Sequence, residues 1–216
     1  MKDKIQTLFD DTKLAFLKSD IKKFAEANNL QWNYSISATP LTKNNTVIVG
    51  FNWGASSEGD IPQLAPPTRN FKSLYDELGS FKKVDSSLRK YFSETEIDNC
   101  VQTNFCFFRS KTEDQISSDD IKLSTPLFET LISLIEPKRI ISFSSKLRDY
   151  FLKDEKLYRP NGELNITSNK KTLYVAKGFY LLKGNEIPVY FLPHPNSKFT
   201  GEARKKAWEF CFGNSE

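Results

Sequence analysis

Short runs of apolar and β-branched residues alternate along this chain with amphipathic stretches, and this alternation restricts the possible folds more than any other feature. Residues 46–50, 99–108 and 139–143 form three such runs, each of a length that suits a buried strand. Two more runs, 173–182 and 188–192, flank a short turn and predict paired strands. Strands that alternate with helices favour a mostly parallel sheet with helices on both faces.

We therefore expect an α/β fold of three layers, α/β/α, around a central four-stranded sheet that is mostly parallel. The 216 residues lie within the size range of one domain, so the whole chain, 1–216, is expected to form one. Residues 1–45 would form an N-terminal helical region, and residues 46–212 the core. The expected main strands are residues 46–50, 100–106, 139–143 and 188–192.

Apolar residues at three- and four-residue steps predict the helices. One helix is expected to begin at Thr125-Pro126, because proline is favoured in a first turn, and to end before Pro137. Residues 54–69 are rich in Gly, Ser and Pro and predict a long loop. The other expected helices span residues 3–29, 71–92, 145–152 and about 201–212.

Composition excludes several classes of protein. No run of about 18 apolar residues is present, so no membrane-spanning helix is expected. Residues 1–11 lack the apolar stretch of a signal peptide, and the three cysteines lack CxxC spacing, so the cytoplasm is the expected location. The chain also has a single histidine, so no metal site is expected. We further expect that the chain needs no cofactor and that it is a monomer.

The formal net charge of +4 permits a nucleic-acid partner without requiring one. The distribution of the charge is more informative, because a cluster of cations follows the only histidine. The cluster consists of Lys198, Arg204, Lys205 and Lys206. Such a cluster is either a solvated helix face or a surface that contacts phosphates.

Polar side chains stand at three of the predicted strand ends. Asn52 follows the first strand, Asn104 lies in the second, and His194 follows the last, between two prolines. Ligands of open α/β sheets bind beyond the carboxyl ends of the strands, so these residues are the first candidates for a site. Each also has a structural interpretation: a turn with positive φ for Asn52, a bonded strand-end amide for Asn104 and an exposed loop for His194.

Together the three side chains suit the recognition of a nucleobase. The sequence contains neither GxGxxG nor a P-loop motif, so no dinucleotide or P-loop site is expected. Two carboxamides and a neutral imidazole offer donors and acceptors to the edge of a base, and the imidazole can also stabilise a leaving anion. The absence of a histidine pair and of paired catalytic carboxylates disfavours metalloenzyme and ordinary glycoside-hydrolase chemistry.

Several short motifs, in order along the chain, resemble those of the uracil-DNA glycosylase superfamily, and within it the mismatch-specific and single-strand-selective branches. Residues 47–54 resemble the family's first strand followed by G-x-N-P-G, and Asn104 resembles its second-strand asparagine. Residues 134–141 are similar to the superfamily's helix, proline and third strand, and residues 193–197 to its final H-P-S motif. The similarity spans the expected core.

The resemblance implies a DNA glycosylase that flips a damaged base, with uracil the expected one, and hydrolyses its N-glycosidic bond. Asn52 would position the attacking water, Asn104 would bind the base, and His194 would stabilise the departing base anion. The other residues expected at the base are Phe51, Trp53 and Leu64. The residues expected to contact DNA are Asn196, Ser197, Lys198, Arg204 and Lys205.

Departures from the family pattern keep an alternative open. Trp53 stands where the family has proline, and residues 61–64 contain no aromatic ring where relatives commonly stack one on the base. Asn196 replaces the serine of the last motif. The alternative is a catalytically inactive glycosylase-like domain that binds nucleic acid, a nucleobase or a nucleotide. A different small-molecule enzyme on the same scaffold is a third possibility.

Overall fold

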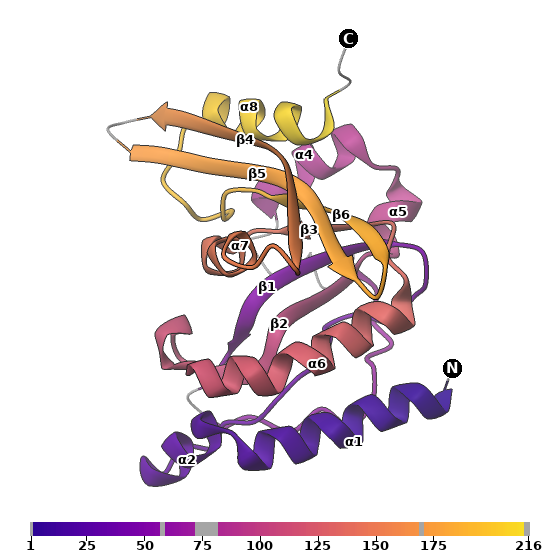
Figure 1. Ribbon diagram of the computed structural model, residues 1–216, viewed down its shortest axis with the longest axis vertical. Coiled ribbons are helices and arrows are strands. Elements are labelled where there is room, and N and C mark those ends of the chain that lie inside the picture. Colours follow the sequence, from indigo (N-terminus) through magenta and orange to yellow (C-terminus); the bar gives the residue numbers. More distant parts are fainter. Residues whose placement is uncertain (1, 57–58, 72–81, 169–170, 214–216) are drawn as a thin grey trace.

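The computed structural model describes residues 2–56, 59–71, 82–168 and 171–213 (Figure 1). These residues form an α/β fold around one mixed, six-stranded sheet with the strand order β2-β1-β3-β6-β5-β4. The strands are β1 (Thr46–Gly54), β2 (Val101–Ser110), β3 (Arg139–Ser142), β4 (Tyr158–Ser168), β5 (Lys171–Leu182) and β6 (Asn185–Phe191).

The four main strands predicted from the sequence form the parallel part of the sheet. β2 and β3 pair with β1 on either side, and β6 pairs with β3. The predicted size of four strands is wrong, because β5 and β4 extend the sheet in antiparallel pairing beyond β6. β5 runs antiparallel to β6 because the connection at Lys183 and Gly184, both with positive φ, is too short for a parallel crossover.

Alternate residues of β1 pack into two separate hydrophobic cores, one on each face of the sheet. Val47, Val49 and Phe51 belong to the first core, and Ile48 belongs to the second. Helices therefore cover both faces, as the alternation of elements predicts (Figure 1). The helices of the first core are α6 (Ser118–Ile135) and α7 (Ser145–Leu152), and those of the second are α4 (Lys82–Tyr91), α5 (Glu94–Asp98) and α8 (Gly201–Phe212).

The N-terminal helical region forms a further layer outside α6 (Figure 1). The single helix expected over residues 3–29 is two helices, α1 (Lys2–Lys18) and α2 (Asp20–Ala27). The break occurs at Ser19, whose side chain accepts a hydrogen bond from the N–H of Lys22 and so begins a new helix. The side chains by which α1 joins the first core are Leu8, Phe9 and Phe16.

One buried carboxylate caps the starts of both α2 and α6. Oδ1 of Asp120 accepts hydrogen bonds from the backbone N–H groups of Asp20, at 2.9 Å, and Ile21, at 3.3 Å. Its Oδ2 accepts the N–H of Ser117 at 3.0 Å. Because the first N–H groups of a helix have no partner within the helix, this arrangement joins the N-terminal layer to the rest of the fold.

One predicted helix boundary lies elsewhere, and one predicted helix is described only in part. α6 begins at Ser118, after a capping box of Ser117 and Asp120, so the prediction of a helix that begins at Thr125 is wrong and Pro126 lies inside the helix. Of the helix expected over residues 71–92, the structure describes the second part as α4, and residues 72–81 lie outside the described residues.

The loop predicted over residues 54–69 is bound to the N-terminal segment that lies along the edge of β2. Oε1 of Gln63 accepts the backbone N–H groups of Ile36 and Ser37, and its Nε2 donates to the carbonyl of Ser37. Ser37 in turn bridges to Thr103 of β2. A side-chain amide thus takes the place of a strand backbone and fixes this loop beside the sheet.

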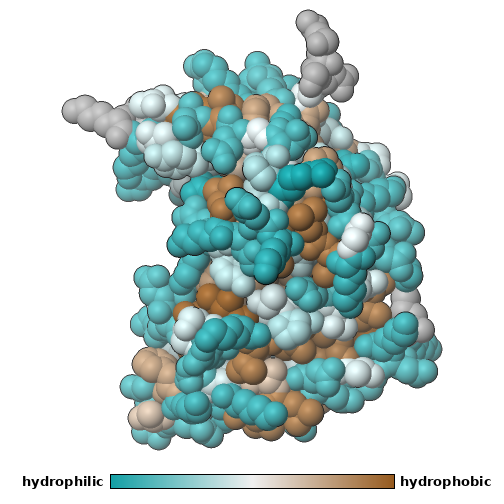
Figure 2. All heavy atoms as spheres, viewed as in Figure 1, coloured by the Kyte–Doolittle hydropathy of each residue, from teal (hydrophilic) through white to brown (hydrophobic). Residues whose placement is uncertain are grey.

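Hydrophilic residues cover most of the face in Figure 2, with hydrophobic patches between them. Within the described ranges, no helix is both long and apolar enough to cross a membrane. The three cysteines, Cys100, Cys106 and Cys211, are free and buried, and burial raises the pKa of each thiol to about 12. None is therefore a thiolate at neutral pH.

Candidate functional site

A cavity of about 420 Å³ opens at the carboxyl ends of the parallel strands. β1, β2 and the segments that follow β3 and β6 contribute to its wall, so it lies where ligands bind in open α/β sheets. Five of the side chains predicted from the sequence line it: Phe51, Asn52, Trp53, Asn104 and His194.

Asn104 is a nearly buried polar residue, 8% exposed, in the wall of the cavity. Its carboxamide lies across Gly50, its register partner on β1, so closely that a Cβ at Gly50 would come within 2.0 Å of Oδ1. Among the described residues, none forms a hydrogen bond with this carboxamide. Because buried amides are normally bonded, the geometry favours a ligand as the missing partner.

Asn52 is half-buried and lies within β1, in extended backbone, so the interpretation as a turn residue with positive φ is wrong. Its Nδ2 donates to Oγ of Ser110 at 2.8 Å and to the carbonyl of Trp53 at 2.9 Å. Both N–H groups of the amide are thereby used. Oδ1 is the atom left to accept a hydrogen bond from a water or a ligand in the cavity.

The imidazole of His194 has a defined tautomer. Its Nδ1 accepts the backbone N–H of Asn196 at 3.1 Å, so the neutral ring carries its proton on Nε2. Ser197 donates to the carbonyl of His194 both from its backbone N–H, at 2.9 Å, and from Oγ, at 2.6 Å. The loop thus holds the ring as a hydrogen-bond donor at the mouth of the cavity.

Glu113 also lines the cavity, and the sequence pattern does not predict it. Glu113 is an exposed residue, yet the pKa of its carboxyl group is raised above the ordinary value. Burial of the carboxyl group is the main cause; the positive charge of Lys146 opposes the shift, and the negative charge of Asp114 adds to it. Lys146 donates to the backbone carbonyl of Glu113 at 2.6 Å and lies over the ring of Phe51 at 4.7 Å. A carboxyl group whose pKa lies above its ordinary value therefore lines the cavity, and its carboxylate form can accept a proton.

The other residues expected at the base differ in position. Phe51 is buried in the first core and borders the cavity. Trp53 is half-buried, its Nε1 is buried without a partner in the described part of the chain, and the guanidinium of Arg109 lies over its ring. Leu64 is 66% exposed and does not line the cavity, because Gln63 binds the loop to the N-terminal segment.

The basic cluster divides into a structural residue and exposed ones. Arg204 donates to the carbonyl of His194 at 3.2 Å and also to the carbonyl of Ser197, and burial lowers the pKa of its guanidinium. Lys198 is exposed on the loop, whereas Lys205 forms a 3.8 Å ion pair with Glu209. Arg204 therefore fixes the loop that carries His194, and the lysines are the side chains that face solvent.

No protein-family model matches this chain, and no curated protein is detectably similar to it. Within the described ranges, no group of His, Cys, Asp and Glu residues has the arrangement of a metal site. The cavity at the strand ends is therefore the feature that indicates what the chain does.

Proposed function

We propose that this chain is a DNA glycosylase that acts as a monomer in the cytoplasm and hydrolyses the N-glycosidic bond of a flipped uracil. The observation that carries the proposal is the convergence of Asn52, Asn104 and His194 on one cavity at the strand ends. The sequence motifs that resemble the uracil-DNA glycosylase superfamily contribute the same three residues.

Asn104 would select the base. A carboxamide presents one acceptor and two donors, and uracil offers an N–H beside carbonyl oxygens on its pairing edge. This carboxamide is buried and has no hydrogen-bond partner among the described residues, which supports the assignment, because a fitting base would satisfy it and a non-fitting one would leave it unpaired.

Asn52, Glu113 and His194 would act on the reacting atoms. Oδ1 of Asn52 would accept a hydrogen bond from a water that attacks C1′ of the deoxyribose, and Glu113 would take the proton that this water loses. The bond from C1′ to the base nitrogen breaks, and its electron pair leaves with the base. The Nε2 proton of His194 would stabilise the resulting anion at a base oxygen.

The test is base release by the purified chain from oligonucleotides that contain uracil, hypoxanthine, xanthine or mismatched thymine. Alkali then cleaves the strand at any abasic site. We expect release from uracil. Asn52→Ala and His194→Ala are each expected to slow it by about 10²–10³-fold, the cost of one pre-organised polar group. Asn165→Ala, at an exposed asparagine on β4, is the matched control and should release at the parent rate.

Binding of the same oligonucleotides without release of any base would contradict the reaction. It would favour the alternative, an inactive glycosylase-like domain that recognises nucleic acid or a nucleobase. Parent-like release by Asn52→Ala would remove Asn52 from the mechanism.

A further inference from the structure

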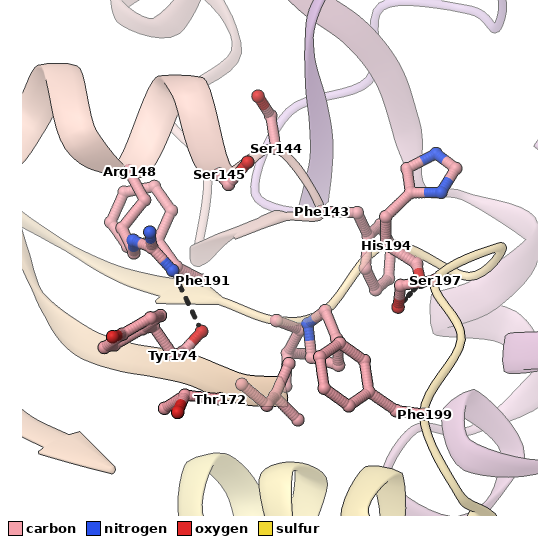
Figure 3. Close-up of a pocket in the computed structure, with 13 residues that line it drawn as sticks. Phe143, Ser144, Ser145, Arg148, Thr172, Tyr174, Phe191, His194, Ser197 and Phe199 are labelled. Carbon is pink, nitrogen blue, oxygen red and sulfur yellow. Dashed lines mark hydrogen bonds between the residues drawn. The ribbon is translucent and has the colours of Figure 1, made fainter. Parts of the chain in front are cut away.

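A second cavity, of about 200 Å³, adjoins the first. Phe143, Ser144 and His194 line both cavities, so the two share a wall. Figure 3 shows the ring of His194 pointing away from Tyr174 and Arg148, which line the far side of the second cavity. Groups bound in the two cavities would therefore be close neighbours, separated by this wall.

Aromatic side chains dominate the second cavity. Tyr174 is 54% exposed, Phe199 is half-buried, and Phe143 and Phe191 form buried parts of the wall. The half-exposed ring of Tyr174 thus lies at the opening of a cavity whose inner wall is aromatic, where it is open to contact a ligand. Open aromatic rings stack on nucleobases whatever their sequence, because every base has a π-face.

The guanidinium of Arg148, which lines this cavity, does not need a bound anion to balance its charge. The guanidinium of Arg148 donates twice to Oδ1 of Asp149, at 2.9 and 2.7 Å, and once to the carbonyl of Tyr174, at 3.1 Å. It also lies over the ring of Tyr174, 5.4 Å from the centroid. Its charge is thus balanced by Asp149, and its contacts hold Tyr174 in place. The cavity suits a planar ring of modest polarity better than a phosphate.

We infer that the second cavity binds an unpaired nucleobase next to the base held in the first. The inference rests on the proposed function. In a duplex, the neighbouring base is paired and stacked and does not enter a cavity. Two adjacent bases of a single strand, in contrast, can enter cavities that share a wall.

The loop after β6 fits this arrangement. Pro195 borders the first cavity, and Ser197 and Phe199 border the second, so the loop passes along both. Lys198 is exposed on the same loop and would be available to a phosphate of the bound strand.

The test is the binding of single-stranded oligonucleotides that contain a 2′-fluorinated deoxyuridine, which resists hydrolysis. Replacing the nucleotide on one side of the uracil by an abasic tetrahydrofuran is expected to weaken binding about 5- to 150-fold, the effect of losing one stacked base. The same replacement on the other side should have a smaller effect. Binding of the corresponding duplex should be weaker than binding of the single strand.

Variants of Tyr174 test whether the effect of the abasic neighbour arises in the second cavity. Tyr174→Ala should bind the intact oligonucleotide more weakly and lose sensitivity to the abasic neighbour, whereas Tyr174→Phe should keep both properties. Leu152→Ala removes another exposed apolar side chain, outside this cavity, and is the matched control. Tyr174 is largely exposed, so its replacement is not expected to prevent folding.

Base release from unmodified uracil oligonucleotides is measured separately, so that the two proposals can fail separately. Equal binding of intact and abasic-neighbour oligonucleotides by the parent would overturn the second-cavity inference even if uracil is released. An abasic effect that persists in Tyr174→Ala would also overturn it. Sensitivity to the neighbour without any release would support this inference and contradict only the reaction.

Discussion

At the scale of single residues, the wall of the cavity depends on Gly50, a residue that has no side chain. Gly50 leaves the space in which the carboxamide of Asn104 lies, because a Cβ there would approach Oδ1 to 2.0 Å. Gly50→Ala should therefore displace Asn104 and reduce the preference for uracil over cytosine by about 5- to 150-fold, the effect of one polar contact of roughly 1–3 kcal/mol. Single-turnover release from uracil and cytosine oligonucleotides measures this ratio.

Gly54 provides the control for this prediction. It lies on the same strand, and a Cβ there would meet no atom within 4 Å. Gly54→Ala should leave the preference unchanged. An unchanged preference in Gly50→Ala as well would show that Asn104 does not select the base.

Glu113 should determine the acidic limb of the pH profile. Its pKa is raised, chiefly by burial, and only the carboxylate accepts a proton, so base release should fall as the pH drops through this raised pKa. Glu113→Gln should lower the rate about 100-fold or more and abolish this limb. The measurement is the single-turnover rate across pH 4–9.

Asp114→Asn is the matched variant. Asp114 raises the pKa of Glu113, so its removal should keep the limb and shift it toward lower pH. A Glu113→Gln profile that kept the parent's acidic limb would assign the limb to another group.

At the scale of elements, the loop after β6 and the start of α8 should separate phosphate binding from the positioning of His194. Lys198→Glu and Lys205→Glu should weaken binding to all DNA sequences alike and reduce its dependence on salt. Arg204→Ala should instead slow base release, because Arg204 holds the carbonyls of His194 and Ser197. Binding titrations at several salt concentrations, with release measured beside them, distinguish the two.

Lys138→Glu is the control, since Lys138 precedes β3 at the opposite end of the sheet from the cavity. A salt dependence unchanged in Lys198→Glu and Lys205→Glu would identify the basic cluster as a solvated helix face.

The strands and helices differ in how far the sequence predicts them. The four parallel strands have dense β-branched and aromatic runs, and their positions are confirmed. β4 has no such run: Pro160 and Gly162 interrupt it at a register shift, and its pairing with β5 is what makes it a strand. The predicted start of α6 is wrong because Pro126 is typical of first turns, whereas the capping box at Ser117 lies outside the apolar stripe.

The site is predictable to a similar extent. Residues at or just after the ends of regular strands, such as Asn52 and His194, can be placed at one edge from the alternation of elements alone. Glu113 belongs to a short 3₁₀ turn after β2 that has no periodic pattern, so nothing in the sequence indicates that it lines the cavity. Leu64 lies outside the cavity because the side chain of Gln63 binds backbone groups far away in the sequence, and no local pattern indicates this contact.

At the scale of the whole molecule, Asp120 connects the N-terminal layer to the sheet and its helices. Asp120→Ala would leave three backbone N–H groups without their acceptor, at roughly 1–3 kcal/mol each, so the free energy of unfolding should fall by at least about 3 kcal/mol. Urea denaturation measures the change. Asp119→Ala, at an exposed neighbour, should cost less than about 1 kcal/mol, and equal losses in both variants would contradict the capping role.

The packing of α1 on α6 has a consequence for how the chain is made. The ribosome adds roughly 5–20 residues each second, so about 5–20 s separate the synthesis of Asp20 from that of Asp120, 100 residues later. Throughout that interval Leu8, Phe9 and Phe16 lack α6, the helix against which α1 packs in the folded chain. The N-terminal layer therefore leaves the ribosome before α6 and reaches its final place only once α6 has followed, and until then its apolar stripe is open to chaperones.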